Sequence, residues 1–235
     1  MLTKNYEQYL EQQLQVYLSN MKILQVYGDY IDKSKISIDI GANRGELCWF
    51  LLKHCSKVIA FEPLPSAFSM LSKIETNRIN IYNLALSNIS KQSILHEPYD
   101  QLLNGYNDGL SSLETSSLDH LNKKFPNRFD KSRQHNVELR RLDEFNFSNI
   151  TTIKVDVEGH EIEVLDGAQE TIFVNKPSLL VEIAWNKKGL TETIRYIEDF
   201  GYGCYYYDVN LNQLKSIKSI SLPISNVYDF LFLPN

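Results

Sequence analysis

Ionisable side chains alternate with valines where a short apolar stretch ends: Lys154, Asp156 and Glu158, with His160 two positions further on. Successive side chains of a β-strand point to opposite faces, so the spacing of two places these residues on one face. A buried parallel strand is normally apolar throughout, because an unpaired charge in a core is costly. The pattern therefore favours a functional site, in which Asp156, Glu158 or His160 could act as a general base.

Two other interpretations of this segment stay open. Asp156 or Glu158 could cap the following helix by accepting hydrogen bonds from its first amides. Asp156, Glu158 and His160 could also offer oxygen and imidazole ligands to a metal ion. Their spacing matches no closed metal site, so we predict none.

A second group of candidate residues lies at the ends of two earlier apolar stretches. The run Asp39-Ile-Gly-Ala-Asn-Arg-Gly45 contains glycines that permit a tight turn and a close approach of the backbone to a ligand. Glu62 follows Gly41 by about 20 positions, the separation at which an acid can accept hydrogen bonds from ribose hydroxyls. Asn43 stands where a dinucleotide fingerprint requires glycine. We therefore expect a cofactor loop, although the turn could be a plain connection and Glu62 a capping acid.

The elements that must position these residues alternate between strand and helix. Strands are predicted at residues 36–40, 57–61, 79–86, 152–157, 178–183, 204–209 and 227–233, and helices at 46–54, 65–77, 161–174 and 191–200. This alternation predicts an α/β fold with a mostly parallel sheet and helices on both faces. No clear helix separates the last two strands, so they could pair antiparallel. Ligands of such sheets bind beyond the carboxyl ends of the strands, where the strand order reverses.

Two segments lie outside the alternation. Apolar residues at helical spacing predict an amphipathic leading helix within residues 1–30, which could cover the core or form a homodimer contact. Residues 87–147 are polar and rich in turns, so we expect them to be an insertion within a single domain of residues 31–235. Within the insertion, the loop Gly109-Leu-Ser-Ser-Leu113 could line a pocket or simply connect two elements.

Histidines and aromatic residues of the insertion could contact a sugar by stacking or hydrogen bonding, although the polarity of the segment favours a solvated loop role for each histidine. They are His96, His120, His135, Tyr99, Tyr106 and Arg133.

Composition excludes several classes of protein. With 235 residues, of which 43% are hydrophobic and 23% charged, the chain resembles an ordinary soluble domain. Its 24 basic and 29 acidic residues give a net charge of −5, which disfavours nucleic acid as a partner. Three cysteines without a CxxC pair cannot form a disulfide framework. Charged residues interrupt the first 30 positions, so we expect no signal peptide or membrane span and a cytoplasmic protein.

In order and spacing, these motifs resemble the FkbM family of S-adenosylmethionine-dependent methyltransferases. The matching runs are Ile38-Asp-Ile-Gly-Ala-Asn-Arg-Gly45, Ala60-Phe-Glu-Pro-Leu-Pro65, Leu84-Ala-Leu-Ser87, Leu110-Ser-Ser-Leu113, Arg141-Leu-Asp143, Ile153-Lys-Val-Asp-Val-Glu-Gly-His-Glu161 and Leu165-Asp-Gly-Ala168. The resemblance implies a class I methyltransferase fold, Rossmann-like, with seven strands and an antiparallel last strand. It also implies methylation of a hydroxyl group on a small-molecule or glycan acceptor such as a sugar or a related natural product.

The resemblance further implies how S-adenosylmethionine would bind. The turn from Gly41 to Gly45 would pass beneath the methionine part, Glu62 would accept from the ribose hydroxyls, and the run ending at Ser87 would border the adenine. The expected cofactor residues are Asp39, Gly41, Asn43, Gly45, Glu62, Ala85, Ser87 and Asp156.

Two other functions would use the same fold, and the sequence disfavours both. An NAD(P)-dependent reductase would share the glycine turn and the ribose acid, but Asn43 and the acidic end of the later strand disfavour it. A non-catalytic glycan-binding relative would have lost cofactor residues, whereas Gly41, Gly45 and Glu62 are all present.

Overall fold

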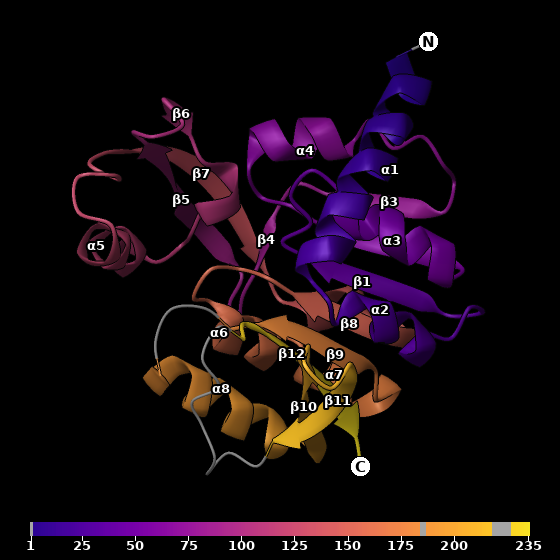
Figure 1. The fold of residues 1–235 in the computed structure, drawn as a ribbon. Coiled ribbons are helices and arrows are strands. Elements are labelled where there is room, and N and C mark those ends of the chain that lie inside the picture. The colour runs from indigo at the N-terminus through magenta and orange to yellow at the C-terminus, as the bar shows by residue number, and fades with distance from the viewer. Residues whose placement is uncertain (1, 184–186, 218–226) are drawn as a thin grey trace.

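The computed structural model describes residues 2–183, 187–217 and 227–235, and its larger sheet has eight strands (Figure 1). In order across the sheet, these are β11 (Gln213–Ile217), β10 (Tyr202–Asp208), β12 (Asp229–Pro234), β9 (Ser178–Glu182), β8 (Ile150–Val155), β1 (Ile36–Ile40), β2 (Lys57–Phe61) and β3 (Ile79–Tyr82). The strands from β9 to β3 run parallel, and β12 is antiparallel to both of its neighbours. The mostly parallel sheet with an antiparallel last strand is therefore confirmed.

The expected number of seven strands is wrong by one. Strand β11 folds back on β10 in an antiparallel hairpin and forms the edge of the sheet. An edge strand buries little of its surface, and only Ile217 of β11 is buried. Its mixed polar sequence consequently has no apolar pattern from which a strand could be predicted.

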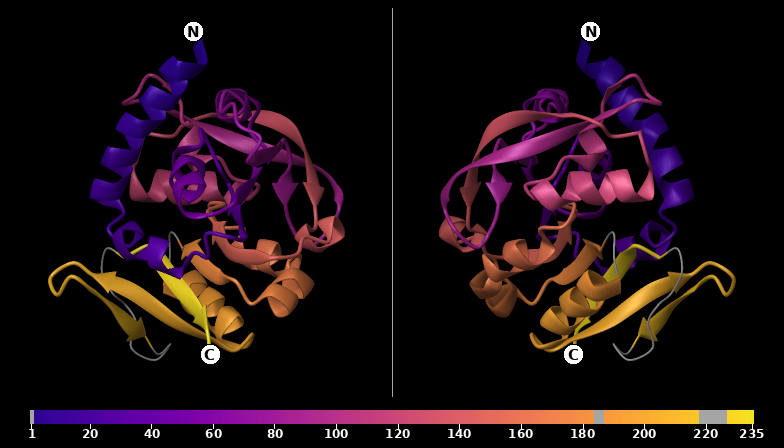
Figure 2. Two further views of the ribbon diagram at one scale, coloured as in Figure 1. Left: turned by 90° about the vertical axis from the view of Figure 1, so that its right-hand side faces the viewer. Right: turned by 90° about the vertical axis from the view of Figure 1, so that its left-hand side faces the viewer.

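Helices cover both faces of the large sheet, as the alternation predicted (Figures 1 and 2). One face packs against α1 (Leu2–Asn20), α2 (Leu24–Tyr27) and α3 (Glu46–His54), and the other against α6 (Glu161–Asp166), α7 (Gln169–Asn175) and α8 (Lys187–Glu198). Residues such as Leu10, Leu14 and Leu51 are fully buried on the first face, and Val164, Ile172 and Ile194 on the second. Among the described residues, no helix has both the length and the apolar character needed to cross a membrane.

The helix predicted at 161–174 is divided into α6 and α7 around Gly167. A Cβ atom at Gly167 would lie 2.0 Å from the carbonyl oxygen of Ser87, so glycine is needed for this close approach. The Asp143 carboxylate then accepts from the amide and hydroxyl of Thr171, which satisfies the first turn of α7. The motif containing Asp143 thus supports α7, the second part of the predicted helix.

The bounds of two other elements also differ from the predicted ones. Helix α4 (Pro65–Leu71) ends before the predicted Asn77, and Ile74 then packs over Gly45. The strand predicted at 79–86 is two strands, because the chain leaves the large sheet after β3.

The polar segment 87–147 contributes three of the four strands of a second sheet, which the sequence did not predict; the fourth lies within the strand predicted at 79–86. Its strands are β4 (Ala85–Leu86), β7 (Ser132–Arg140), β5 (Lys91–Asp100) and β6 (Gly105–Tyr106), accompanied by α5 (Thr115–Lys124) and by short 3-10 turns η2 (Asp108–Leu110) and η3 (Leu142–Phe145). Only a few apolar side chains of the sheet, among them Leu95, Val137 and Leu139, pack against the α4 segment. Some inward positions of β5 are themselves charged, since Glu97 and Asp100 are buried, so the strand lacks a strong alternating pattern.

Candidate active site

A crevice opens at the carboxyl ends of β1, β2 and β8, and the second sheet and its loops form its other wall. The strand order reverses between β1 and β8, where ligands of doubly wound sheets bind. The residues lining this crevice are Ile40, Gly41, Asn43, Phe61, Glu62, Pro63, Leu84, Ala85, Leu86, Leu95, Asp108, Gly109, Ser111, Leu113, Asp156, Val157, Glu158 and His160.

The glycine turn brings the β1 loop against the β8 loop. Gly41 has a φ of 78°, and a Cβ atom there would lie 1.8 Å from the carbonyl oxygen of Asp156. Its amide donates to Phe61 at the end of β2. Gly45 has a different role, because a Cβ atom there would lie 2.8 Å from Leu71 and Ile74, and it is not among the lining residues of the crevice. Only the first glycine therefore borders the predicted cofactor position.

Glu62 is buried at the end of β2 and ties two loops together. Its Oε2 accepts from the amide of Asn43 and its Oε1 from the amide of Leu64, both at 2.8 Å. Burial raises the pKa of Glu62 to about 7 despite these hydrogen bonds. Each carboxylate oxygen has a second lone pair, so Glu62 can accept from a ligand as well as support the backbone. The capping interpretation and the ribose-binding interpretation are thus compatible.

The expected adenine border is divided between the crevice and the core. Ala85 lines the crevice beside Leu84 and Leu86, which gives that end an apolar surface. Ser87 is buried and is not among the lining residues, and its hydroxyl forms a 2.9 Å hydrogen bond with Nε2 of His160.

His160 is engaged at both ring nitrogens. Besides Ser87 at Nε2, the Nδ1 atom lies 3.0 Å from Oε1 of Glu114. The ring therefore links Ser87, which follows β4, to Glu114 of the insertion. Both ring nitrogens of the predicted general base therefore have hydrogen-bonding partners within the protein.

A second cavity of about 480 Å³, the acidic cleft, adjoins the crevice and lies beneath the C-terminal half of α1. The two cavities share Gly41, Asn43, Gly109, Asp156 and Glu158. The remaining lining residues of the acidic cleft are Gln13, Val16, Tyr17, Asn20, Met21, Asp39, Ala42, Glu46, Leu47, Lys154, Glu182 and Asp229.

Carboxylates dominate the acidic cleft, and Lys154 is the one basic residue among its lining residues. Lys154 is buried and forms a salt bridge with Asp156. The charge of Asp156, together with burial, raises the pKa of Glu182 to about 9. Burial also raises the pKa of Asp39 and of Asp229 to about 6 each. Near neutral pH, Glu182 is therefore mainly protonated, whereas Asp39 and Asp229 are mainly ionised.

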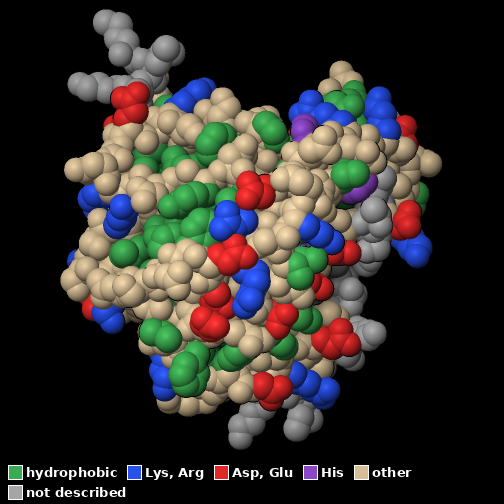
Figure 3. All heavy atoms as spheres, turned by 180° about the vertical axis from the view of Figure 1, so that it is seen from behind, with side chains coloured by type: hydrophobic (Ala, Val, Ile, Leu, Met, Phe, Trp, Pro, Cys, Tyr) green, Lys and Arg blue, Asp and Glu red, His purple; other side chains and the backbone are tan. Residues whose placement is uncertain are grey.

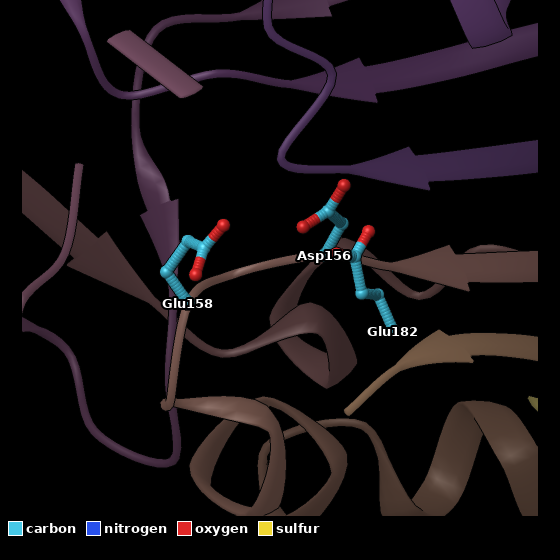
Figure 4. Close-up of side chains that lie close together, drawn as sticks. All are labelled: Asp156, Glu158 and Glu182. Atoms are coloured by element: carbon cyan, nitrogen blue, oxygen red, sulfur yellow. The ribbon is translucent and has the colours of Figure 1, made fainter. Parts of the chain in front are cut away.

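Three of these carboxylates approach one another closely (Figure 4). Asp156 follows β8, Glu182 ends β9, and Glu158 reaches toward them from the β8 loop. One carboxylate oxygen of each lies within 4.8 Å of the others. The sequence had grouped His160 with Asp156 and Glu158 as conceivable metal ligands, but the structure replaces it with Glu182.

Several residues of the site were not predicted. Glu182 and Asp229 stand at the edge where ligands bind, and their positions next to strands are a signal that the sequence already carried. Tyr17 was predicted only as part of an apolar helix face, although it lines the acidic cleft. The hydroxyl oxygen of Ser111 is buried in the crevice wall without a hydrogen-bond partner among the described residues.

The insertion's basic and aromatic residues lie elsewhere. Figure 3 shows Lys, Arg and His side chains gathered on the insertion at the upper right of the back face. Arg133 and His135 contact the buried carboxylate of Glu97, and Arg133 also stacks over Tyr106. None of these four residues lines the crevice or the acidic cleft, and the side chain of His120 is outside the described residues.

The fold is that of class I methyltransferases. It matches the crystal structure of the methyltransferase FkbM from Methylobacillus flagellatus with a TM-score of 0.54 and 17% sequence identity. The match covers 86% of this chain and 44% of that chain, so the present chain spans less than half the length of that protein.

Sequence comparison defines the family within this class. Residues 39–204 match the methyltransferase FkbM domain, and the chain therefore belongs to the FkbM methyltransferase family. It is similar to methyltransferase sdnD of Sordaria araneosa, with 28% identity over 193 residues, covering 70% of this chain and 72% of the relative. It is also similar to methyltransferase 1 of Beauveria bassiana, with 23% identity over 180 residues, covering 70% and 71%. The expected family and methyltransferase activity are confirmed, and the reductase alternative is set aside.

Proposed function

We propose that this chain transfers the methyl group of S-adenosylmethionine to a hydroxyl group of a sugar, a glycan or a related natural product. The observation that carries the proposal is the junction of the two cavities. An elongated cofactor in the crevice would present its methyl group beside Asp156 and Glu158, where the acidic cleft begins. Donor and acceptor would then meet at one point, and orientation accounts for much of the catalysis of a bimolecular transfer.

The crevice suits the three parts of this cofactor. Leu84, Ala85 and Leu86 offer an apolar surface for the adenine. Glu62 can accept from the ribose hydroxyls, and the Gly41 turn lets the backbone approach the methionine part. Asp39 and Asp156 lie on the acidic side, where a carboxylate would stabilise the ammonium and sulfonium charges of the cofactor.

The acidic cleft suits an acceptor that donates hydrogen bonds. When ionised, its carboxylates can only accept hydrogen bonds, and hydroxyl groups are natural donors to them. The amides of Gln13 and Asn20 and the phenol of Tyr17 add further hydrogen-bonding groups from α1. An anionic acceptor would be repelled by the same carboxylates. A polyhydroxylated, uncharged acceptor is therefore the class that the lining favours.

The transfer needs a base for the acceptor proton. The acceptor oxygen would bond to the methyl carbon as the carbon–sulfur bond breaks, which yields a methyl ether and S-adenosylhomocysteine. The proton would pass to a carboxylate, and Asp156 and Glu158 border both cavities. We assign the base to this pair, with His160 holding the β8 loop in place through Ser87 and Glu114.

Calorimetric titration with S-adenosylmethionine and with NADH tests the cofactor part of the proposal. We expect only S-adenosylmethionine to bind, and Glu62→Gln to weaken binding at least tenfold, about 1.4 kcal/mol. Glu75→Gln is the matched control, because Glu75 is exposed and remote from the crevice. Absence of S-adenosylmethionine binding would contradict the proposal.

A panel of glycosides, free sugars and aliphatic alcohols, screened by release of S-adenosylhomocysteine, tests the acceptor part. Mass spectrometry should find a methyl ether on a sugar hydroxyl. Methylation confined to nitrogen, sulfur or carbon atoms would contradict O-methylation while leaving methyl transfer intact.

A further inference from the structure

The acidic residues of the cleft are gathered by strand register. Asp39 pairs with Lys154 across β1 and β8, and Glu182 pairs with Asp229 across β9 and β12. Paired residues of neighbouring strands have side chains on the same face of a sheet. Asp156 comes two positions after Lys154 and just beyond β8, and Figure 4 shows its carboxylate beside that of Glu182. These side chains therefore line one face of the sheet edge, beneath α1.

The three carboxylates of Asp156, Glu158 and Glu182 have the spacing of ligands around one ion. Their nearest oxygens fall within 4.8 Å of one another, and Figure 4 shows the Glu158 carboxylate facing the other two across a gap. Oxygens on opposite sides of a divalent cation are about 4–5 Å apart, since each bond is about 2.0–2.6 Å. The three residues are half-buried, which would limit competition from bulk water.

Two further carboxylate oxygens in the cleft independently indicate a bound cation. Asp39 is 1% exposed, and its Oδ1 atom has no hydrogen-bond partner among the described residues. Oδ1 of Asp229, beside Glu182, is buried and has none either. Buried carboxylate oxygens are normally paired, because an unpaired one loses its hydration without compensation. Both residues line the cleft that contains the three-carboxylate group.

Among the described residues that line the cleft, acidic side chains outnumber basic ones. Lys154 is the single lysine or arginine among the lining residues, and its ammonium group is already engaged by Asp156. Glu182, Asp39 and Asp229 line the same cleft as this lysine.

We propose that Asp156, Glu158 and Glu182 bind one divalent cation with a preference for oxygen ligands, such as Mg²⁺ or Mn²⁺, with Asp229 supporting the site beside Glu182. The binding itself is independent of methyl transfer. The purpose we assign to the ion rests on the proposed function: it orients the acceptor hydroxyl at the junction of the two cavities and favours loss of its proton. The proton would pass to the carboxylate oxygen of Asp156 or Glu158 that does not bind the ion.

Mn²⁺ binding to the chelator-treated full chain tests the inference directly. Free Mn²⁺ gives an electron paramagnetic resonance signal that is lost on binding, so the titration needs no acceptor. We expect one Mn²⁺ per chain, with Mg²⁺ competing for it. Glu182→Gln and Glu158→Gln should each weaken Mn²⁺ binding at least tenfold.

Glu170→Gln is the matched control, because Glu170 is exposed on α7, away from the cleft. It should bind Mn²⁺ like the wild type, and circular dichroism establishes that each variant is folded. Mn²⁺ should raise the melting temperature of the wild type and of Glu170→Gln, but not of Glu182→Gln. Absence of Mn²⁺ binding at millimolar concentration, or equal binding by Glu182→Gln, would overturn the inference.

The same samples separate this inference from the proposed function. If S-adenosylmethionine binds and its methyl group is transferred while Mn²⁺ does not bind, the metal site is wrong and the methyltransferase proposal stands. If Mn²⁺ binds but S-adenosylmethionine does not, the metal site stands and the proposed function is wrong.

Discussion

At the scale of single residues, Gly41 carries the strictest requirement of the site. Its backbone is left-handed, and the Asp156 carbonyl occupies the space that a side chain would need. Glu62 and His160 are less strictly constrained: hydrogen bonds to neighbouring groups restrict the orientation of each side chain. The candidate site is therefore preorganised by its own backbone and by neighbouring side chains before a ligand binds.

Gly41→Ala should weaken S-adenosylmethionine binding at least tenfold and lower the melting temperature. The loop must move, because the added Cβ would lie 1.8 Å from the Asp156 oxygen. Calorimetry and thermal unfolding measure the two effects.

Gly201→Ala is the control that separates the steric clash at Gly41 from the cost of a left-handed backbone. Gly201 has a similar φ of 83°, but a Cβ atom there would meet nothing within 4 Å. It should show only the cost of the left-handed conformation, about 1–2 kcal/mol, with unchanged cofactor affinity. Equal losses of affinity in the two variants would refute the steric argument.

At the scale of elements, strand ends and α1 together create the acidic cleft. Helix α1 is held on the core by buried residues such as Leu10 and Leu14, and by Glu11, which pairs with Lys53 and accepts from Trp49. Its C-terminal half is thereby presented to the ends of β8, β9 and β12. We infer that the leading helix selects the acceptor in addition to covering the core.

Tyr17→Phe should raise the KM for the acceptor about fivefold while leaving the affinity for S-adenosylmethionine unchanged. Tyr17 lies within electrostatic range of Lys154, Asp156 and Glu182, and loss of one hydrogen bond corresponds to about 1 kcal/mol. Steady-state kinetics with an acceptor from the panel measure the change. Tyr30→Phe, at an exposed tyrosine outside both cavities, should behave like the wild type.

Glu182 should make the metal-free protein less stable as pH rises. Its pKa is about 9 in the folded state against 4.5 for an ordinary glutamate, so the folded state binds the proton more tightly. The stabilisation is present below about pH 4.5 and is lost progressively as pH rises toward 9. Glutamine mimics the protonated form and removes this loss.

Urea unfolding in the presence of a chelator measures this effect. Between about pH 5.5 and 8.5, Glu182→Gln should gain roughly 1–3 kcal/mol relative to the wild type, below the limit of about 1.4 kcal/mol per pH unit. Glu170→Gln should follow the wild type. Parallel pH profiles for Glu182→Gln and the wild type would show that Glu182 titrates normally.

At the scale of the whole molecule, the large sheet and the insertion meet across the crevice. Arg44 of the glycine turn pairs with Asp108 of the insertion, and Ser112 donates to the Glu158 carbonyl. A ligand in the crevice would contact both parts and stabilise them together. The surface pair of Arg44 and Asp108 by itself contributes little, about 0–1 kcal/mol.

S-adenosylmethionine should raise the melting temperature of the whole chain in one cooperative transition. At about 100 times its dissociation constant, a ligand adds about 2.7 kcal/mol of stability. For a domain of this size, each kcal/mol corresponds to roughly 2–4 °C, so the expected rise is about 5–10 °C. Differential scanning calorimetry measures it, and NADH at the same concentration should produce no shift. A rise confined to one of two separate transitions would show that the crevice does not couple the two parts.

The sequence by itself determined the elements whose spacing is local. Periods of two and of about 3.6 residues predicted β1, β2 and α3 with their observed bounds, and placed Asp39, Glu62 and Asp156 where strands end. These periods arise from backbone geometry and do not depend on the rest of the fold. The alternation of strands and helices predicted a mostly parallel sheet, and the order and spacing of the motifs indicated the family.

Only the tertiary structure decided which of these residues meet. Strand order and register bring Glu182 and Asp229 to Asp156, although they are distant in the chain. The same packing gives His160 its two partners and places Tyr17 over the cleft. The insertion's sheet was also decided at this level, because its few buried apolar residues, such as Leu95, Val137 and Leu139, are identified only by their packing on the α4 segment. Contacts between distant residues depend on how whole elements pack, and a single chain's local pattern does not encode that packing.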